Sequence, residues 1–447
     1  MTRNTSDHCS GQAGTGRYAG RHEPEDLPGS TILTTDFRAK SPAWRLIKSY
    51  TYMIRNTRNT YFLIFFFAVV SFLTACRQPV SKGDTAAGDK GNTTDAPAFT
   101  KAVLKYAHGF LIDYHDHYKL LSVLNHAGGK TDTMKFVLVQ EGTPVPEGYP
   151  GAQVITIPVK SLVVMSSMHV AVADFAGVAD RITGLGNFSF INSPLVRTAI
   201  KEGKVQQVGL DGNINNELII TMHPGILMTM SNPDASFGKY KTLMDAGVPV
   251  LPNAEWLENT PLGRAEWVKL MAALVNREGL VNKKFDSVER AYNELAQLGT
   301  KAATRPHVII GMPFKGTWYL PAGESYQAKF LLDAGAGYQW ADTKGIGSLA
   351  LNFEAVAPEA LKADYWMNLA QVDTKKEIVG KDPRYAGFKP FQTNGIYNNT
   401  QRVNDIGSND YWESGAVSPD VILADLIHIL HPELLPNHTL VYYKQLK

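Results

Sequence analysis

The sequence has few cysteines, little excess charge of either sign and no apolar run long enough for a comfortable transmembrane helix. Cys9 and Cys76 are the two cysteines among 447 residues, too few for a disulfide framework or a zinc cage. Lysine and arginine number 44 against 42 acidic residues, and no region gathers the basic side chains on one helical face. These absences argue against a disulfide-stapled scaffold, a structural zinc site and a nucleic-acid interface.

The composition is that of a globular protein. Hydrophobic residues make up 44% and charged residues 19% of the chain, which leaves enough apolar surface for sizeable cores. A chain of this length accommodates two or three domains.

Residues 53–76 have the order of a secretory signal. Arg55 and Arg58 precede the apolar run YFLIFFFAVVSFL at 61–73, and the small residues of LTAC follow. The run falls short of the ~20 residues that a membrane-spanning helix needs. The segment LTAC resembles a bacterial lipobox, and this resemblance implies cleavage before Cys76 and a lipid on its thiol.

We therefore predict an exported, periplasmic protein that is anchored to a membrane through Cys76. Residues 1–52 show no periodicity and are interpreted as a non-functional extension, with Met53 as the true start. Residues 77–97 are polar and rich in Gly, Asp and Thr, which indicates a flexible tether. A signal anchor with a chance cysteine is the alternative.

Residues 261–298 form the longest helical pattern of the chain. Apolar residues recur at helical spacing on both sides of Gly279, which we interpret as a helix stop. The sequence predicts one helix over 262–278 and a second over 280–298, about 28 Å long at ~1.5 Å per residue. Because one stiff helix is a poor hinge, we expect a small opening motion between the parts that it joins.

Short strand-like runs alternate with helical patterns before and after this stretch. The fold class predicted is therefore α/β, with two Rossmann-like lobes joined by a single long α-helix. The lobes are expected at 98–278 and 301–447, and the bridging helix at 279–300. Alternating patterns within 106–124 and 135–140 indicate antiparallel strands at the start of the first lobe.

Histidines offer no convincing metal site. In YHDHY at 114–118, His115 and His117 are expected on one solvated face of a strand, without a third ligand nearby. His169 follows a predicted strand, whereas His223 and His307 precede theirs. Three histidines at opposite ends of the sheets cannot converge on one ion, so we predict no metal site.

Four segments carry a resemblance to a known family: MSSMHVAVADFAGVADRITGL, NINNELIITMHPGILMTM, LMDAGVPVL and NTPLGRAEWVKLMAAL. They resemble the periplasmic binding proteins for iron–siderophore, haem and cobalamin uptake, over residues 98–447. The resemblance implies a monomeric solute-binding protein without enzymatic activity or resident cofactor. It also implies a partner, the membrane permease of an ABC importer.

The cargo expected from this resemblance is a ferric siderophore or a related iron chelate. Haem or cobalamin is the alternative within the same family. A bare zinc or manganese ion and a two-lobed chelatase-like enzyme are the alternatives from other classes. The sequence shows no nucleophile elbow or phosphate-binding glycine loop that would favour an enzyme.

Candidate ligand contacts follow from the rule that open α/β sheets bind ligands beyond the carboxyl ends of their strands. Aromatic side chains suit a macrocycle or catecholate, and cations suit an anionic chelate. Met168 and His169 could serve as axial ligands of haem, and each aromatic could instead belong to a core. The predicted contacts are Ser166, Ser167, Met168, His169, Phe188, Phe190, Lys315, Trp318, Tyr319, Arg402, Tyr411 and Trp412, with 231–233 as a further segment.

Two glutamates occupy matching places in the two predicted lobes. Glu217 lies in NNELII and Glu354 in NFEAVAPEA, each near the start of a predicted helix. The resemblance implies that they dock the lobes on arginines of the permease, which would set the register of the complex. The alternative is a helix-start carboxylate that is stabilised by the helix dipole.

Overall fold

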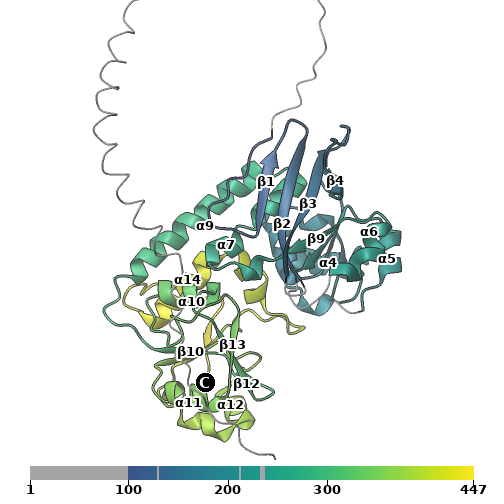
Figure 1. Ribbon diagram of the computed structural model, residues 1–447. Helices are drawn as coiled ribbons and strands as arrows, with labels where there is room; N and C mark the ends of the chain where they lie inside the picture. The colour runs from purple at the N-terminus through teal and green to yellow at the C-terminus, as the bar shows by residue number, and fades with distance from the viewer. Residues whose placement is uncertain (1–98, 128–129, 211–212, 232–236) are drawn as a thin grey trace, which may run out of the picture. The chain divides into compact units, whose positions relative to one another are not determined.

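The computed structural model describes residues 99–127, 130–210, 213–231 and 237–447 (Figure 1). The predicted extension, signal segment, lipidation site Cys76 and tether lie outside these residues. Within them, no helix combines the length and the apolar character needed to cross a membrane. The predicted α/β class with two lobes and a long connecting helix is confirmed.

The chain opens with a four-stranded sheet in the order β1-β2-β3-β4, antiparallel except for the parallel pair β3–β4. Its strands are β1 (Phe110–Tyr114), β2 (Tyr118–Ala127), β3 (Lys130–Gln140) and β4 (Gln153–Ile157). The predicted antiparallel strands are therefore present. Alternate residues such as Leu121, Val123 and Phe136 are buried, as the period of two requires.

The histidines of YHDHY do not share a strand face. The backbone N–H of His115 donates to the carbonyl of Tyr118 at 2.9 Å, which closes the turn between β1 and β2. The His115 ring stacks on Tyr118 with centroids 4.3 Å apart. Both histidines lie in this turn because the strands end on either side of them, which corrects the predicted strand face.

A five-stranded, fully parallel sheet forms the centre of the first lobe, in the order β7-β6-β5-β8-β9. Its strands are β5 (Leu162–Val164), β6 (Ile182–Leu185), β7 (Gln206–Gln207), β8 (Ile226–Met230) and β9 (Val250–Asn253). The connecting helices are α3 (Ser167–Phe175), α4 (Pro194–Lys201), α5 (Asn216–Met222) and α6 (Lys241–Asp245). The strand order reverses between β5 and β8, so loops diverge at this point of the sheet.

The second lobe contains two small sheets. One is β10 (Val308–Ile310), β14 (Tyr365–Met367), β15 (Ile396–Asn398) and the antiparallel β16 (Lys444–Gln445). The other is antiparallel, with β11 (Pro313–Phe314), β12 (Thr317–Pro321) and β13 (Ser348–Leu351). The helices are α10 (Tyr326–Asp333), α11 (Phe353–Ala360), α12 (Lys375–Lys381), α13 (Lys389–Gln392) and α14 (Pro419–Leu430).

Strands β11 and β12 make a hairpin, in which Lys315 and Gly316 take positive φ at the turn. β12 also pairs with β13, and the last strand, β16, pairs with β15. These two pairings join strands that are distant in the sequence, which local pattern does not specify.

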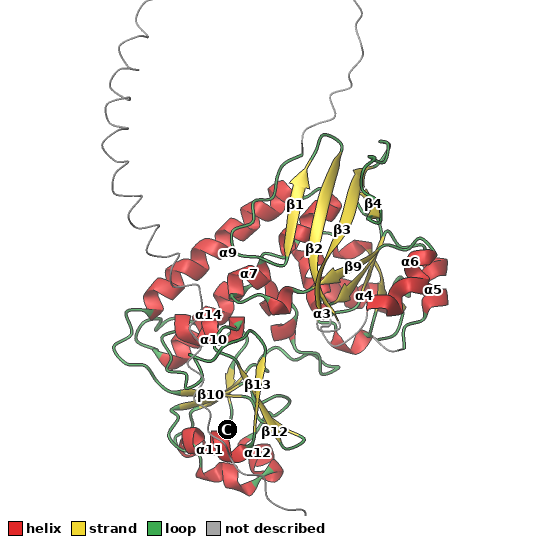
Figure 2. Cartoon of the chain, viewed as in Figure 1, coloured by secondary structure: helices red, strands yellow, loops and turns green. Residues whose placement is uncertain are grey.

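The connecting helix α9 (Glu278–Gly299) packs on α8 (Val268–Val275) of the first lobe and on α10 and α14 of the second (Figure 2). It has 22 residues, or about 33 Å at ~1.5 Å per residue. Gly279 is not the stop between the two helices. Asn276 ends α8 in the left-handed conformation, with φ of 56°, and Gly279 lies in the first turn of α9.

The segment before β1 is held by two buried acids, Glu258 and Glu266, which lie on either side of α7 (Pro261–Ala265). The carboxylate of Glu266 accepts the backbone N–H groups of residues 105–107 at 2.7–3.1 Å. Glu258 accepts those of His108 and Gly109 at 2.9–3.0 Å. These bonds satisfy backbone donors that no strand or helix pairs, and they fix the first lobe to the helices that lead to the second.

Candidate functional site

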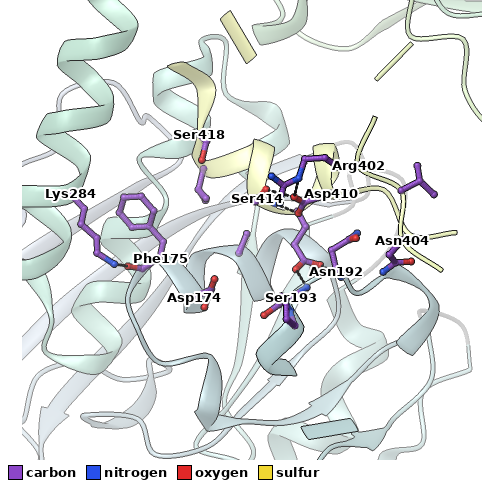
Figure 3. A pocket seen from close by; sticks show the side chains of 15 residues that line it. Asp174, Phe175, Asn192, Ser193, Lys284, Arg402, Asn404, Asp410, Ser414 and Ser418 are labelled. Carbon is purple, nitrogen blue, oxygen red and sulfur yellow. Dashed lines mark hydrogen bonds and ion pairs between the residues drawn. The ribbon is translucent and has the colours of Figure 1, made fainter. Parts of the chain in front are cut away.

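A cavity of about 550 Å³ lies where loops of the two lobes meet beside α9 (Figure 3). The first lobe contributes the end of α3 and residues 192–194, and α9 contributes Lys284. The second lobe contributes parts of the loop 402–418. The volume falls within the range of small-molecule sites, and the lining is rich in charged and hydroxyl groups.

Glu413 joins the two lobes at the wall of this cavity. Its carboxylate accepts the backbone N–H of Asn192 at 2.8 Å and that of Ser193 at 2.6 Å. Burial above all, with a smaller contribution from the charges of Asp410 and Asp174, raises the pKa of the Glu413 carboxyl to about 7, against the opposing effect of the two N–H groups. The group therefore titrates near neutral pH.

Arg402 and Asp410 form an ion pair on the second-lobe side. The Arg402 Nε lies 2.7 Å from the Asp410 carboxylate, which also accepts the Ser414 hydroxyl at 2.7 Å. Arg402 remains more than half exposed, so its guanidinium can still meet an anionic ligand. Arg402 is the predicted ligand contact that lines this cavity.

The opposite wall comes from α3 and α9. Lys284 of α9 donates to the backbone carbonyl of Phe175 at 2.8 Å, which closes that side. Asp174 is exposed and adds a third carboxylate to the lining, after Glu413 and Asp410 (Figure 3). The cavity thus presents separated positive and negative groups rather than an apolar surface.

Asparagines shape the loop that carries Arg402 and Glu413. The side-chain oxygen of Asn404 accepts the backbone N–H groups of Ile406 and Ser408 at 3.1 and 3.0 Å. The side chain of Asn409 accepts that of Tyr411 at 3.1 Å. Such local bonds hold a turn without regular secondary structure, and they order the part of the loop that leads to Glu413.

Four predicted contacts are buried in cores and are corrected here. Met168 and His169 point into the first lobe from the start of α3, with relative exposures of 2% and 0%. Trp318 packs with its ring centroid 6.1 Å from that of Trp366, and Tyr411 is also buried. Their apolar faces pack between helices and sheets, so they offer no surface to a ligand in this structure.

The other predicted contacts remain accessible in part. Ser166 caps α3 by accepting the backbone N–H of Met168, and Ser167 and Phe188 are half-buried. Phe190, Lys315, Tyr319 and Trp412 are exposed. Within the described chain, Ser231 is buried at the end of β8, whereas 232–233 lie outside the described residues.

The three histidines considered as metal ligands lie on separate parts of the fold. His169 is buried in α3, while His223 and His307 are exposed just before β8 and β10. No three His, Cys, Asp or Glu side chains converge as metal ligands anywhere in the part of the chain that the structure describes.

The paired glutamates have matching local settings. Glu217 lies in the first turn of α5, whose Asn215 cap accepts the backbone N–H of Leu218. Glu354 lies in the first turn of α11, whose Asn352 cap accepts that of Ala355. Both carboxylates are exposed, so either the docking role or the dipole role is sterically open to them.

Sequence reasoning missed the acidic members of the cavity, namely Asp174, Asp410 and Glu413. The loop was identified by its aromatics and Arg402, and its acids were passed over. One signal was present, because Asp410 and Glu413 lie in a segment rich in Asn, Gly and Ser between two apolar stretches. Such segments often carry functional groups.

Two α/β lobes on one connecting helix, with a polar cavity at their meeting loops, define a two-lobed solute-binding fold. The periplasmic binding protein family matches residues 162–403, more than half of the chain, and the chain belongs to that family. Its members are solute-binding proteins that work with ABC importer permeases, and they are not enzymes. The chelatase alternative is therefore excluded.

The chain is also similar to named proteins. One uncharacterized lipoprotein of Methanocaldococcus jannaschii is 30% identical over 375 residues, which cover 76% of this chain and 85% of that protein. A second uncharacterized lipoprotein of the same organism is 26% identical over 367 residues, which cover 77% of this chain and 87% of that protein. The triscatecholate siderophore binding protein FeuA of Bacillus subtilis, solved with ferri-bacillibactin, is 16% identical and covers 63% of this chain and 95% of its own, with a TM-score of 0.47.

Proposed function

We propose that the protein is the solute-binding lipoprotein of an ABC importer, and that it captures a ferric siderophore or a related iron chelate and delivers it to the permease. The observation that carries the cargo class is a set of exposed aromatic side chains, one in the first lobe and two in the second. Phe190 is 54% exposed, Tyr319 51% and Trp412 42%. Full burial of an exposed apolar side chain contributes roughly 1.5–3 kcal/mol, and a flat ligand that covers these half-exposed rings can recover part of that.

Exposed cations accompany these aromatics. Lys315 lies at the tip of the hairpin that carries Tyr319, and Arg402 lies ten residues before Trp412. Catecholate and carboxylate chelates of iron are flat and anionic, so they match aromatic faces flanked by basic groups. This combination favours an iron chelate over cobalamin, for which the aromatics alone would serve.

Haem remains the alternative from the same family, and it loses part of its support. The residues considered as axial ligands were Met168 and His169, and both are buried here. Haem would need either other ligands or a rearrangement of α3. The aromatic and basic side chains suit its ring and propionates equally, so the titration described next includes it.

Tryptophan fluorescence tests the proposal, with Trp412 as the reporter. Trp318 was also predicted to contact the ligand, but it is buried in the second-lobe core and is unsuitable as a reporter. The chain is titrated in parallel with a ferric tris-catecholate, haemin and cobalamin. Saturable quenching at micromolar concentration or below by one compound names the cargo class.

The variant Trp412→Phe is the matched control, because light absorption by the coloured compounds quenches both proteins alike. Quenching that is the same in both would mean absorption rather than binding near Trp412. If none of the three compounds binds by calorimetry either, the proposed cargo class is wrong.

The permease contact assigned to Glu217 and Glu354 is part of this proposal. Each glutamate lies in the first turn of an asparagine-capped helix, one in each lobe, and this matching position supports the docking role. Two fixed, exposed carboxylates on separate lobes provide the register that a docking surface needs. A dipole contribution of roughly 0.3–1 kcal/mol to each helix is expected in either case.

The lipid anchor at Cys76 is proposed on the sequence motif. The names of the two Methanocaldococcus jannaschii relatives, both lipoproteins, support export and membrane attachment. A tethered binding protein stays within reach of its permease, which raises its effective concentration there.

A further inference from the structure

Two histidines of the second lobe lie side by side, one on α14 and one in the segment that follows it. His428 lies in the last turn of α14, and His438 lies in the loop after the helix. Their ring centroids are 5.8 Å apart, and the ring planes are inclined by 60°. Both side chains are partly exposed, and neither lines the cavity between the lobes.

Each of these rings has one nitrogen bound to an acceptor. Nδ1 of His428 lies 2.8 Å from the carbonyl oxygen of Leu435, and Nε2 of His438 lies 2.6 Å from the carboxylate of Asp425. Because these oxygens accept, the two nitrogens carry the ring protons. In the neutral rings Nε2 of His428 and Nδ1 of His438 therefore each present a lone pair. Neither lone pair has a hydrogen-bond partner in the described chain, and both nitrogens remain accessible.

We propose that His428 and His438 together bind one divalent transition-metal ion such as Zn²⁺. Metal-binding histidines typically donate their other ring N–H to a carbonyl or a carboxylate, which fixes the tautomer and the ring orientation. Two imidazoles on a tetrahedral zinc ion, with Zn–N distances of about 2.0–2.1 Å, have ring centres about 5 Å apart. The observed separation is close to this value, so a small shift of either ring brings both nitrogens to one ion.

Water completes the coordination, since no third His, Cys, Asp or Glu converges on this pair within the described residues. Imidazole nitrogen suits zinc, copper and nickel rather than calcium or magnesium. With two protein ligands, we expect micromolar affinity rather than the tighter binding of a closed four-ligand site. The ion is separate from the cargo, and the inference holds whichever solute occupies the cavity.

The bound ion would cross-link α14 to the loop 431–438. The same loop leads to residues 441–443, whose backbone N–H groups donate to the Asp425 carboxylate at 2.7–3.2 Å. Strand β16 follows and pairs with β15 at the edge of the lobe's sheet. The ion would therefore stabilise the connection through which the end of the chain joins this sheet.

Calorimetric titration of the full, untagged chain with Zn²⁺ at pH 7 tests the assignment. His428→Gln and His438→Gln should each weaken this site by at least about 10–100-fold, the effect of losing a group that merely orients a ligand. Glutamine can still donate a hydrogen bond to the Leu435 carbonyl or to the Asp425 carboxylate, which preserves the fold. His108→Gln, at an exposed histidine of the first lobe, is the matched control and should bind as the wild type does.

The difference between wild type and variants is the readout, so zinc bound at other groups does not affect it. No micromolar site in the wild type would refute the proposal. So would equal affinity in the wild type and in folded His428→Gln, with folding checked by circular dichroism.

Hydrogen exchange of the wild-type protein provides a test without any variant. The backbone N–H groups of Leu434 and His438 donate to carbonyls within the loop, at 2.9 and 3.1 Å, and report its opening. If opening releases the ion, Zn²⁺ at a hundred times its Kd should slow exchange in residues 431–440 by about a hundredfold. Exchange in the buried strand β2 should stay constant. Unchanged exchange in residues 431–440 at this zinc concentration would overturn the proposal.

Discussion

Replacing Lys119 by methionine should destabilise the first lobe strongly, because it breaks a buried ion pair. Lys119 of β2 is fully buried, and its ammonium lies 2.5 Å from the carboxylate of Glu278 at the start of α9. It also donates to the carbonyl of Ala273 and the side chain of Asn276, both at 2.8 Å. Burial lowers the pKa of Lys119, although Glu278 acts in the opposite direction.

The magnitude follows from what the substitution leaves behind. Methionine has a similar length and fills the space of the lysine stem, so no large cavity forms. Glu278, 3% exposed, would then be a buried carboxylate without its partner. Breaking a buried pair in this way costs about 3–5 kcal/mol. The double variant Lys119→Met/Glu278→Leu removes both charges and should regain most of that loss.

Urea unfolding followed by circular dichroism measures these free energies, on the first transition if the lobes unfold separately. Lys241→Met is the control, because its pair with Asp245 is exposed, at 72% and 61%, and should contribute less than about 1 kcal/mol. A loss below about 1 kcal/mol for Lys119→Met would refute the reasoning. So would a double variant as unstable as the single one, since the unpaired charge would then not be the cause.

Three further predictions concern docking, the aromatics and the anchor. Charge reversal of Glu217 and Glu354 together should abolish uptake in cells while cargo affinity stays unchanged, and an equal fall in affinity would argue against docking. Trp318→Ala should lower the free energy of unfolding by about 3–5 kcal/mol. Tyr319→Ala should change it by less than about 0.5 kcal/mol and weaken cargo binding by roughly 0.5–1.5 kcal/mol. The reverse ranking would overturn the assignment of Trp318 to the core and of Tyr319 to the ligand. Cys76→Ser should move the protein from the membrane to the soluble fraction on cell fractionation, and continued membrane association would contradict lipidation there.

Local pattern was sufficient for most elements of the fold. The strands β6 and β8 are short apolar runs flanked by polar or turn-forming residues, which is the pattern that indicates an α/β fold. The helix α9 follows from apolar residues at helical spacing, with Phe285 and Tyr292 on its buried face. The helix boundary at Gly279 was misplaced, because Asn276 can also adopt the left-handed conformation that ends a helix.

The candidate site was predicted less well than the fold. The strand-end rule picked out the loop of Arg402, which lines the cavity, but it does not state which side chain turns inward. Tyr411 and Trp412 are adjacent in sequence, yet Tyr411 is buried and Trp412 is exposed. Trp318 and Tyr319 on β12 differ in the same way: Trp318 is buried and Tyr319 is exposed, because successive side chains face opposite sides of a strand.

The sequence by itself determined the α/β class, the two lobes and the connecting helix. Hydrophobic periodicity and the turn-forming residues between elements are local properties, so each segment shows them without its tertiary partners. It also pointed to the family through the order of its segments. Only the tertiary structure decided that Glu413 meets Asn192 and Ser193, about 220 residues away. The physical reason is that burial and the field of neighbouring charges arise from long-range packing, and these set both the pKa of a carboxyl group and the exposure of an aromatic ring.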